Sequence, residues 1–213
     1  MVSSAVRKDA ALFMVCLCSS LFFLGLYQFN NKYSQNTIQA ANGILALSEE
    51  ELQKSPVRFL VSGWAFYPDA LLTPEEIQDE SHYMRYLSIG EQTNFSSPAN
   101  PSPYGCGTYQ MTFFLPERKE TYALEIPEVF SAYNLYLDHD LILQMGDPAQ
   151  GTPLVQNRMV TFHGGKPVTL TIAVSNYDHF YGGIVYPPAF GTMLAVNTTR
   201  GIRFAFCLFS CTV

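Results

Sequence analysis

The sequence predicts an all-β fold, a jelly-roll sandwich of about eight strands, preceded by an N-terminal transmembrane helix. Between Gly107 and Met145, apolar and polar residues alternate in four successive segments, and the three- and four-residue spacing of helices is missing. Short breaks rich in proline or acidic residues separate these segments. Ahead of them, Ala10–Tyr27 carries no charge. One buried face per strand predicts two antiparallel sheets packed face to face.

The four central segments each present one apolar face. The residues expected on the buried faces are Tyr109, Met111, Phe113 and Leu115; Tyr122, Leu124 and Ile126; Tyr133, Leu135 and Leu137; and Leu141, Leu143 and Met145. Between the third and fourth segments, Asp138-His139-Asp140 is typical of a tight hairpin turn. We prefer this interpretation to a metal site because calcium requires six or more oxygen ligands.

The composition is that of a folded, acidic protein. Hydrophobic residues make up 48% of the chain, which supplies a core and excludes global disorder. The net charge is −6, and residues 28–199 hold 17 acidic against 8 basic residues, a net charge of −9. Such a surface repels phosphate backbones, so we expect no nucleic-acid partner.

Four of the five cysteines lie outside the predicted β-domain. Cys16 and Cys18 lie in the N-terminal apolar run, Cys207 and Cys211 in a C-terminal one, and only Cys106 lies between. A single thiol forms no internal disulfide, and no Cys/His spacing of a zinc site is present. We therefore expect no metal and no cofactor.

Ala10–Tyr27 predicts a transmembrane signal anchor, since 18 apolar residues just span a bilayer. Arg7 and Lys8, in the short segment 1–9, keep the N-terminus cytoplasmic and send the rest of the chain across the membrane. A cleaved signal peptide is the alternative, but no small-residue cleavage site follows promptly. Both alternatives place the β-domain outside the cytoplasm.

Residues 28–56 are expected to form a polar linker that spaces the domain from the bilayer. It contains a short predicted helix over Ile44–Leu52, because Ser48 stands ahead of three glutamates. The β-sandwich is assigned to residues 57–198, and its first strand is expected over Val57–Tyr67.

Beyond that strand, Thr73-Pro74-Glu75-Glu76 predicts a helix start, with threonine as the cap and proline in the first helical position. Tyr83–Leu87 predicts a strand and Asn94–Tyr104 a loop.

The second half of the domain contains four further predicted strands: Arg158–Phe162, Val168–Ser175, Ile184–Tyr186 and Phe190–Val196. A polar and aromatic loop, Asn176–Gly183, follows the second of them. Residues 199–213 are assigned to the start of a transmembrane segment, because Ile202–Val213 is apolar but shorter than the roughly 20 residues that a span requires. This pattern predicts a truncated product or a fragment of a longer receptor.

Several motifs occur together in a fixed order. They are Gly63-Trp64-Ala65-Phe66-Tyr67-Pro68, Leu71-Leu72-Thr73-Pro74-Glu75-Glu76, Gly107-Thr108-Tyr109, Ile126-Pro127 with Ser131-Ala132-Tyr133, and Val174-Ser175-Asn176 with Gly182-Gly183. Over Val57–Val196 they resemble the extracytoplasmic jelly-roll domain of bacterial seven-transmembrane receptors with diverse intracellular signalling modules. The resemblance implies a galactose-binding-like sandwich similar to carbohydrate-binding modules, followed by seven membrane helices and an output module, which this sequence lacks. More distantly, Tyr133–Gly146 is similar to a strand-turn-strand in the sugar-binding sandwich of some β-glycosidases.

The loop Asn176–Gly183 is the predicted ligand-binding surface, because sugars are recognised by aromatic faces and planar polar groups. The candidate binding residues are Asn176, Tyr177, His179, Tyr181, Trp64 and Tyr109. A structural role remains open for several of them. Trp64 and Tyr109 also suit a sandwich core, and Asn176 also suits a strand end.

No catalytic residues are predicted, and we expect the protein not to be an enzyme. Glu125 and Glu128 could suggest a glycosidase pair, but nothing else catalytic lies near them in the sequence. His163 is interpreted as a loop residue beside two glycines. No Ser/His/Asp pattern or nucleotide-binding loop is present.

These observations predict the ligand-sensing, carbohydrate-binding-like domain of a membrane-anchored bacterial signal-transduction receptor. The chain would cross the cell membrane once, with the β-domain extracytoplasmic and a small molecule or carbohydrate as ligand. The alternatives are an anchored carbohydrate-binding module without a signalling role, or the sugar-binding part of a β-glycosidase-like protein. A homodimer is left open.

Overall fold

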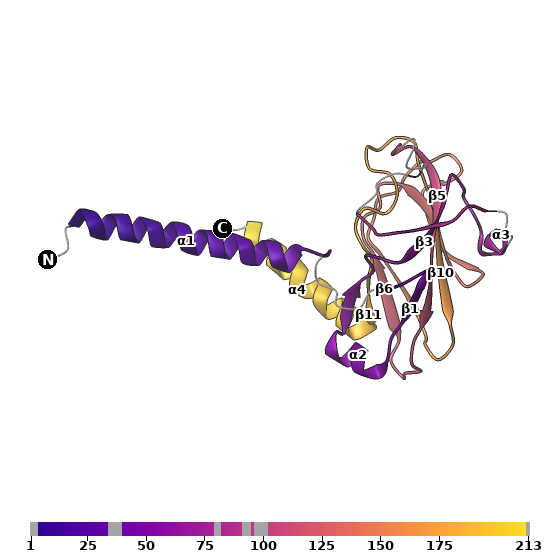
Figure 1. The fold of residues 1–213 in the computed structure, drawn as a ribbon, viewed down its shortest axis with the longest axis horizontal. Coiled ribbons are helices and arrows are strands. Elements are labelled where there is room, and N and C mark those ends of the chain that lie inside the picture. The colour runs from indigo at the N-terminus through magenta and orange to yellow at the C-terminus, as the bar shows by residue number, and fades with distance from the viewer. Residues whose placement is uncertain (1–3, 34–39, 79–81, 91–94, 96–101, 212–213) are drawn as a thin grey trace. The chain divides into compact units, whose positions relative to one another are not determined.

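The computed structural model describes residues 4–33, 40–78, 82–90, 95 and 102–211 (Figure 1). The chain divides into two compact units, Met1–Ser34 and Gln35–Val213.

The first unit is one long helix, α1 (Ser4–Asn30). Within it, Lys8–Phe29 is 22 residues of apolar sequence with no part buried, long enough to cross a membrane by length and composition. At 1.5 Å per residue this segment is about 33 Å long, which matches a hydrocarbon core of about 30 Å. The helix therefore fits a membrane anchor or a signal sequence.

The second unit is a β-sandwich, as predicted. Sheet A has the strand order β4-β3-β5-β10-β7-β8, with β1 also paired to β5, and sheet B has the order β2-β11-β6-β9. The strands of sheet A are β1 (Ile44–Ala46), β3 (Trp64–Pro68), β4 (Arg85–Leu87), β5 (Gly105–Phe114), β7 (Ala132–Leu137), β8 (Asp140–Met145) and β10 (Val168–Asn176). Those of sheet B are β2 (Val57–Phe59), β6 (Tyr122–Ile126), β9 (Arg158–Phe162) and β11 (Ala189–Thr192). Every pairing is antiparallel except the parallel pair β1–β5.

The four central strands form where the alternation predicts them, and the apolar faces of β5, β6 and β7 meet between the sheets. The predicted burial of Leu141 is wrong: β8 is the edge strand of sheet A, and its pairing with β7 shifts register between Leu135 and Tyr136. Leu141 is 50% exposed, Leu143 is partly buried, and only Met145 of this face is fully buried.

An aromatic cluster joins the two layers: Phe113 of sheet A stacks on Phe190 of sheet B at 5.2 Å between ring centroids. Tyr122 and Phe162 complete this cluster around Phe190. The predicted hairpin is also confirmed, with β7 and β8 joined through Asp138, whose φ of 54° suits a tight turn.

The fold is not strictly all-β, because three helices accompany the sandwich: α2 (Glu49–Lys54), α3 (Pro74–Ile77) and α4 (Met193–Cys211). The predicted helix start at Thr73 is confirmed. Its side chain accepts a hydrogen bond from the Glu76 amide, and the Glu76 carboxylate accepts one from the Thr73 amide.

The single strand expected over Val57–Tyr67 is instead two strands in different sheets. β2 joins sheet B and β3 joins sheet A, and the chain crosses between them at Leu60–Gly63. Gly63 has a φ of 80°, and a Cβ there would lie 2.0 Å from the carbonyl oxygen of Ala40. The crossing therefore needs glycine at this position.

The short helix expected over Ile44–Leu52 begins later, at Glu49, and is capped by Ser48. Ile44–Ala46 adds strand β1 to sheet A, and Leu45 and Leu52 are buried in the core. Part of the expected linker is thus built into the sandwich, because its apolar residues have a core to enter.

The strand expected over Phe190–Val196 ends at Thr192, where α4 begins. The Thr192 hydroxyl accepts a hydrogen bond from the Ala195 amide, which is the geometry of a helix cap. The start of α4 packs on sheet B, where Val196 is buried. No strand forms over the expected Ile184–Tyr186, and the expected loop at Asn94–Tyr104 falls mostly outside the described residues.

Removing the ring of Phe190 tests whether the aromatic cluster holds the two sheets together. We expect Phe190→Ala to lower the free energy of unfolding by about 3–5 kcal/mol, because it leaves a cavity between the layers. Phe114→Ala is the matched control, since Phe114 is 44% exposed, and should change stability by about 0.5 kcal/mol or less. Urea unfolding followed by the fluorescence of Trp64, the one tryptophan of the chain, measures both. Equal effects of the two substitutions would contradict this role.

Candidate functional site

The predicted binding loop follows β10 and is held by the buried side chain of Asn176. Its amide nitrogen Nδ2 donates to the carbonyl oxygens of Pro103, at 2.8 Å, and His179, at 2.6 Å. Its Oδ1 accepts from the His179 amide at 3.0 Å. With 1% of its surface exposed, Asn176 fixes the loop from beneath and does not face a ligand.

The same loop turns its aromatic residues outward. Phe180 is 74% exposed, Tyr177 50% and Tyr181 44%. The His179 ring stacks on Phe130 with centroids 4.6 Å apart and planes 10° apart, and its Nδ1 accepts from the Tyr181 amide at 3.1 Å. We call these five residues, Phe130, Tyr177, His179, Phe180 and Tyr181, the aromatic loop surface.

Two further contacts fix the position of the aromatic loop surface. Tyr177 lies over Gly151, where an added Cβ would be 2.0 Å from the tyrosine ring. Gly182 is equally confined, because a Cβ there would lie 2.2 Å from the carbonyl oxygen of Pro103. The exposed rings are thus presented on a constrained backbone.

Trp64 and Tyr109 do not belong to this surface. Trp64 is fully buried and donates from Nε1 to the carbonyl oxygen of Leu60 at 2.9 Å. Tyr109 is also buried, with its ring edge-on to Trp64 at 6.3 Å. The inward face of a strand in a sandwich places them in the core, which is the structural role left open for them, and not on the aromatic loop surface.

Of the predicted binding residues, the structure therefore brings together Tyr177, His179 and Tyr181. The sequence reasoning missed Phe180 and Phe130 as binding candidates. Phe180 lies inside the predicted loop and was identifiable there. Phe130 lies 49 residues before His179 in the chain, and only the folded sandwich places the two rings together.

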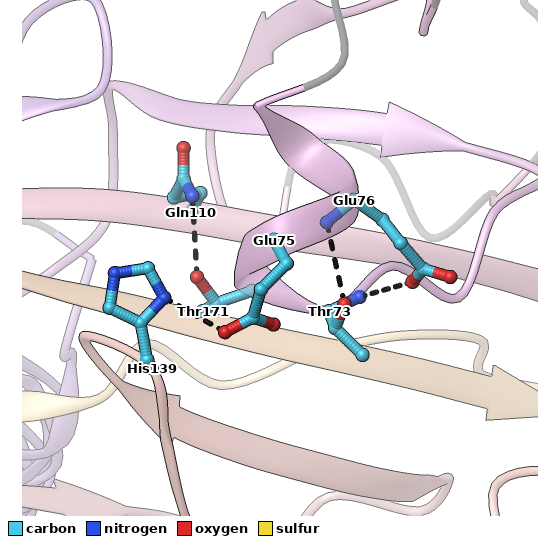
Figure 2. Close-up of polar contacts among 6 residues, drawn as sticks. All are labelled: Thr73, Glu75, Glu76, Gln110, His139 and Thr171. Atoms are coloured by element: carbon cyan, nitrogen blue, oxygen red, sulfur yellow. Dashed lines mark hydrogen bonds and ion pairs between the residues drawn. The ribbon is translucent and has the colours of Figure 1, made fainter.

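A concave region lies on the outer face of sheet A, beside α3. Figure 2 shows the polar contacts of this region. Its floor is polar because the outward residues of β5 and β10 pair across the sheet. Gln110 Nε2 donates to the Thr171 hydroxyl at 3.3 Å, and the Thr112 and Thr169 hydroxyls lie 3.1 Å apart.

The segment that carries α3 is fastened over this floor. The Thr108 hydroxyl donates to the carbonyl oxygen of Ala70 at 2.8 Å and accepts from the Leu72 amide at 2.9 Å. At the outer end, His139 Nδ1 and the Glu75 carboxylate lie 2.8 Å apart, both exposed (Figure 2). Glu75's own backbone amide, and then His139, hold the pKa of the Glu75 carboxyl below its usual value.

The sheet A groove is the resulting space, with a volume of about 790 Å³. Its lining residues come from four stretches of the chain: Pro74, Ile77 and Gln78; Gln110 and Thr112; Asp138, His139 and Asp140; and Lys166, Pro167 and Thr169. Pockets of about 300–1,000 Å³ accommodate small organic ligands.

Two of the acidic residues considered in the sequence, Asp138 and Glu125, have structural partners. Asp138 Oδ1 accepts from the Thr169 amide at 2.8 Å, which supports the hairpin. Glu125 Oε1 accepts from Asn157 Nδ2 at 2.9 Å and lies 3.8 Å from Arg200 Nε. Among the described residues, no group of three or more His, Cys, Asp or Glu side chains is placed to hold a metal.

No protein-family model matches the sequence, and no characterised protein matches it by sequence. Its fold does match solved structures. A glycosyl hydrolase family 2 member from Bacteroides cellulosilyticus matches with a TM-score of 0.51 and 12% identity, over 64% of this chain and 20% of that one. The chain shares a β-sandwich fold with this protein.

Two further structures match with lower scores. The β-galacturonidase of Eisenbergiella tayi, solved bound to galacturonate, matches with a TM-score of 0.45 and 14% identity, over 63% of this chain and 24% of that one. The β-glucuronidase of Ruminococcus gnavus matches with a TM-score of 0.45 and 12% identity, over 73% of this chain and 30% of that one. This chain thus corresponds to less than a third of each of these proteins. These comparisons do not support the resemblance to the receptor family.

The core position of Tyr109 predicts a loss of stability in alkali. Burial raises the pKa of Tyr109 to about 12, and burial does the same for Tyr133. A raised pKa stabilises the fold fully below the unfolded value of about 10, and this stabilisation is lost as the pH rises toward 12. We expect the free energy of unfolding to fall from pH 10 upward, and Tyr109→Phe to reduce that fall. Urea unfolding at pH 8, 10 and 11 measures it. Identical pH profiles of the parent and Tyr109→Phe would show that the hydroxyl is not buried.

Proposed function

We propose that this protein is a membrane-anchored, non-catalytic carbohydrate-binding β-sandwich. The observation that carries the proposal is the aromatic loop surface, where three exposed rings stand on a loop locked from beneath by Asn176. Exposed aromatic side chains on a soluble surface mark a binding site when they are grouped and not scattered.

The chemistry of such a surface suits sugars. The faces of pyranose rings are apolar C–H surfaces that stack on aromatic rings, while polar neighbours bind the hydroxyl groups. His179 supplies a polar group beside the rings. Its Nδ1 accepts a hydrogen bond from the Tyr181 amide, so Nε2 is the ring nitrogen that would bind a sugar hydroxyl. Because the loop is fixed before binding, little conformational entropy is lost when a ligand is bound.

The fold shared with the family 2 structure supports the sandwich architecture. The ligand class rests on the loop, because likeness at 12% identity extends to fold alone. We propose no catalytic role, since Glu125 is engaged by Asn157 and Arg200 on the outer face of sheet B.

A receptor sensor is the second candidate, and one observation favours it. β11 runs directly into α4 at Thr192–Met193, so a shift of sheet B on ligand binding would move this helix. A sensor requires a ligand-dependent change in amide hydrogen exchange in α4. A binding module without signalling does not.

Truncating the exposed rings tests the binding surface. In lipid nanodiscs of phosphatidylcholine, which present no sugar headgroups, we expect the full chain to bind members of a glycan array. Each stacked ring contributes about 0.5–1.5 kcal/mol, so the double variant Tyr177→Ala/Phe180→Ala should weaken binding about tenfold or more. Phe114→Ala, at the opposite end of β5 from Gly105, serves as the matched exposed control. Unchanged glycan binding by the double variant would exclude this surface.

The proposed topology has its own test. Gln150 is exposed on the turn after β8, so Gln150→Cys offers a reactive thiol on the sandwich. If α1 anchors the chain with the sandwich extracytoplasmic, a membrane-impermeant maleimide should label this thiol in intact spheroplasts of a bacterial host. The parent chain controls for its native cysteines. Labelling only after lysis would place the sandwich in the cytoplasm.

A further inference from the structure

We propose that the sheet A groove is a second saccharide-binding site, selective for neutral or amino sugars over uronates. It lies on the outer face of sheet A, under α3, whereas the aromatic loop surface lies beyond the end of β10. The inference rests on the proposed carbohydrate binding for its ligand class only. The groove itself is argued from its own residues.

The floor of the groove is built from groups that bind hydroxyls. Gln110 has a planar amide with two donors and an acceptor oxygen, and Thr112 and Thr169 each have a hydroxyl that donates and accepts. The bond from Gln110 to Thr171 and the bond between Thr112 and Thr169 fix the positions of these groups and leave further bonding capacity on each. A polar floor with fixed geometry is what recognition of several sugar hydroxyls requires.

The walls of the groove make it a defined site. α3 begins with a complete capping box at Thr73. The segment before it is hydrogen-bonded to Thr108 of the sheet through Ala70 and Leu72. On the far side, the hairpin carrying Asp138 is held by the Thr169 amide. Glu75 and His139 connect the two walls at 2.8 Å (Figure 2).

The charges around the groove determine which sugars fit. Asp138, Asp140 and the neighbouring Glu75 supply three carboxylates, against one ammonium from Lys166. The resulting negative potential disfavours a uronate carboxylate and favours an ammonium group or an uncharged ring.

The decisive experiment is calorimetric titration of the full chain in phosphatidylcholine nanodiscs at pH 7. The three probes are lactose, the glucosamine disaccharide chitobiose, and digalacturonate. We expect lactose or chitobiose to bind, and digalacturonate to bind about tenfold more weakly or worse. Gln110→Ala and Thr112→Val should each weaken that binding about tenfold, since each leaves a sugar hydroxyl without its partner.

Matched controls separate a lost contact from a damaged fold. Gln144→Ala alters an exposed glutamine of sheet A outside the groove, and Thr161→Val alters an exposed threonine of sheet B. Both should leave affinity unchanged. Asp140→Asn, at an exposed wall position, should raise the affinity for digalacturonate relative to lactose without touching the floor.

Each outcome is decisive. Binding weakened both by the groove variants and by Tyr177→Ala/Phe180→Ala supports two sites. Binding lost in the groove variants and kept in Tyr177→Ala/Phe180→Ala supports the groove and removes the loop from the proposed function. Binding lost only in the loop variant overturns the groove and leaves the proposed function intact. Digalacturonate bound as tightly as the other sugars, or no binding of any probe, overturns the inference.

Discussion

The pairing of β10 with β5 on one side and β7 on the other is the constraint on which the rest of the structure depends. Nine register pairs join β10 to β5, from Val168–Phe113 to Asn176–Gly105. The inward residues of β10 enter the core, and its last residue, Asn176, fixes the loop. Its Thr169 lines the groove, and its Thr171 accepts a hydrogen bond from Gln110 of the groove floor. A one-residue slip would exchange the two faces and destroy both sites together.

β5, β6 and β7 were predictable because each has one face in the core, so that apolar and polar residues alternate along the strand. In β8, at the edge of sheet A, the same alternation predicts the strand but not its burial, since only Met145 is buried. The errors cluster where tertiary contacts override local pattern. Val57–Tyr67 has a continuous strand-like sequence, yet the backbone approach of Ala40 at Gly63 forces a crossing between sheets. Similarly, Phe190–Val196 has strand-like residues, but the Thr192 cap and the burial of Val196 against sheet B turn it into a helix.

The site was predictable only in its local part. Tyr177, His179 and Tyr181 lie within five consecutive positions of one loop, between a strand end and two glycines. Aromatic residues of a loop that has no core to enter stay at the surface. The sheet A groove gave no such signal. Its floor and walls come from residues up to about a hundred positions apart in the sequence. Single Gln and Thr residues on the solvent-facing side of a strand are typical of any β-sandwich, so they do not indicate a site.

Tyr109 shows why aromatic residues alone do not define a sugar site. Its ring is buried against Trp64, yet the backbone of Ile184 bonds to its hydroxyl group, and a Cβ on Gly183 would lie 2.3 Å from that oxygen. Position 183 therefore requires glycine, because its φ of 79° suits glycine and a side chain there would collide with the Tyr109 hydroxyl. The core tyrosine thus shapes the loop that carries the exposed rings, and depth in the sandwich determines which aromatic residues support the surface and which form it.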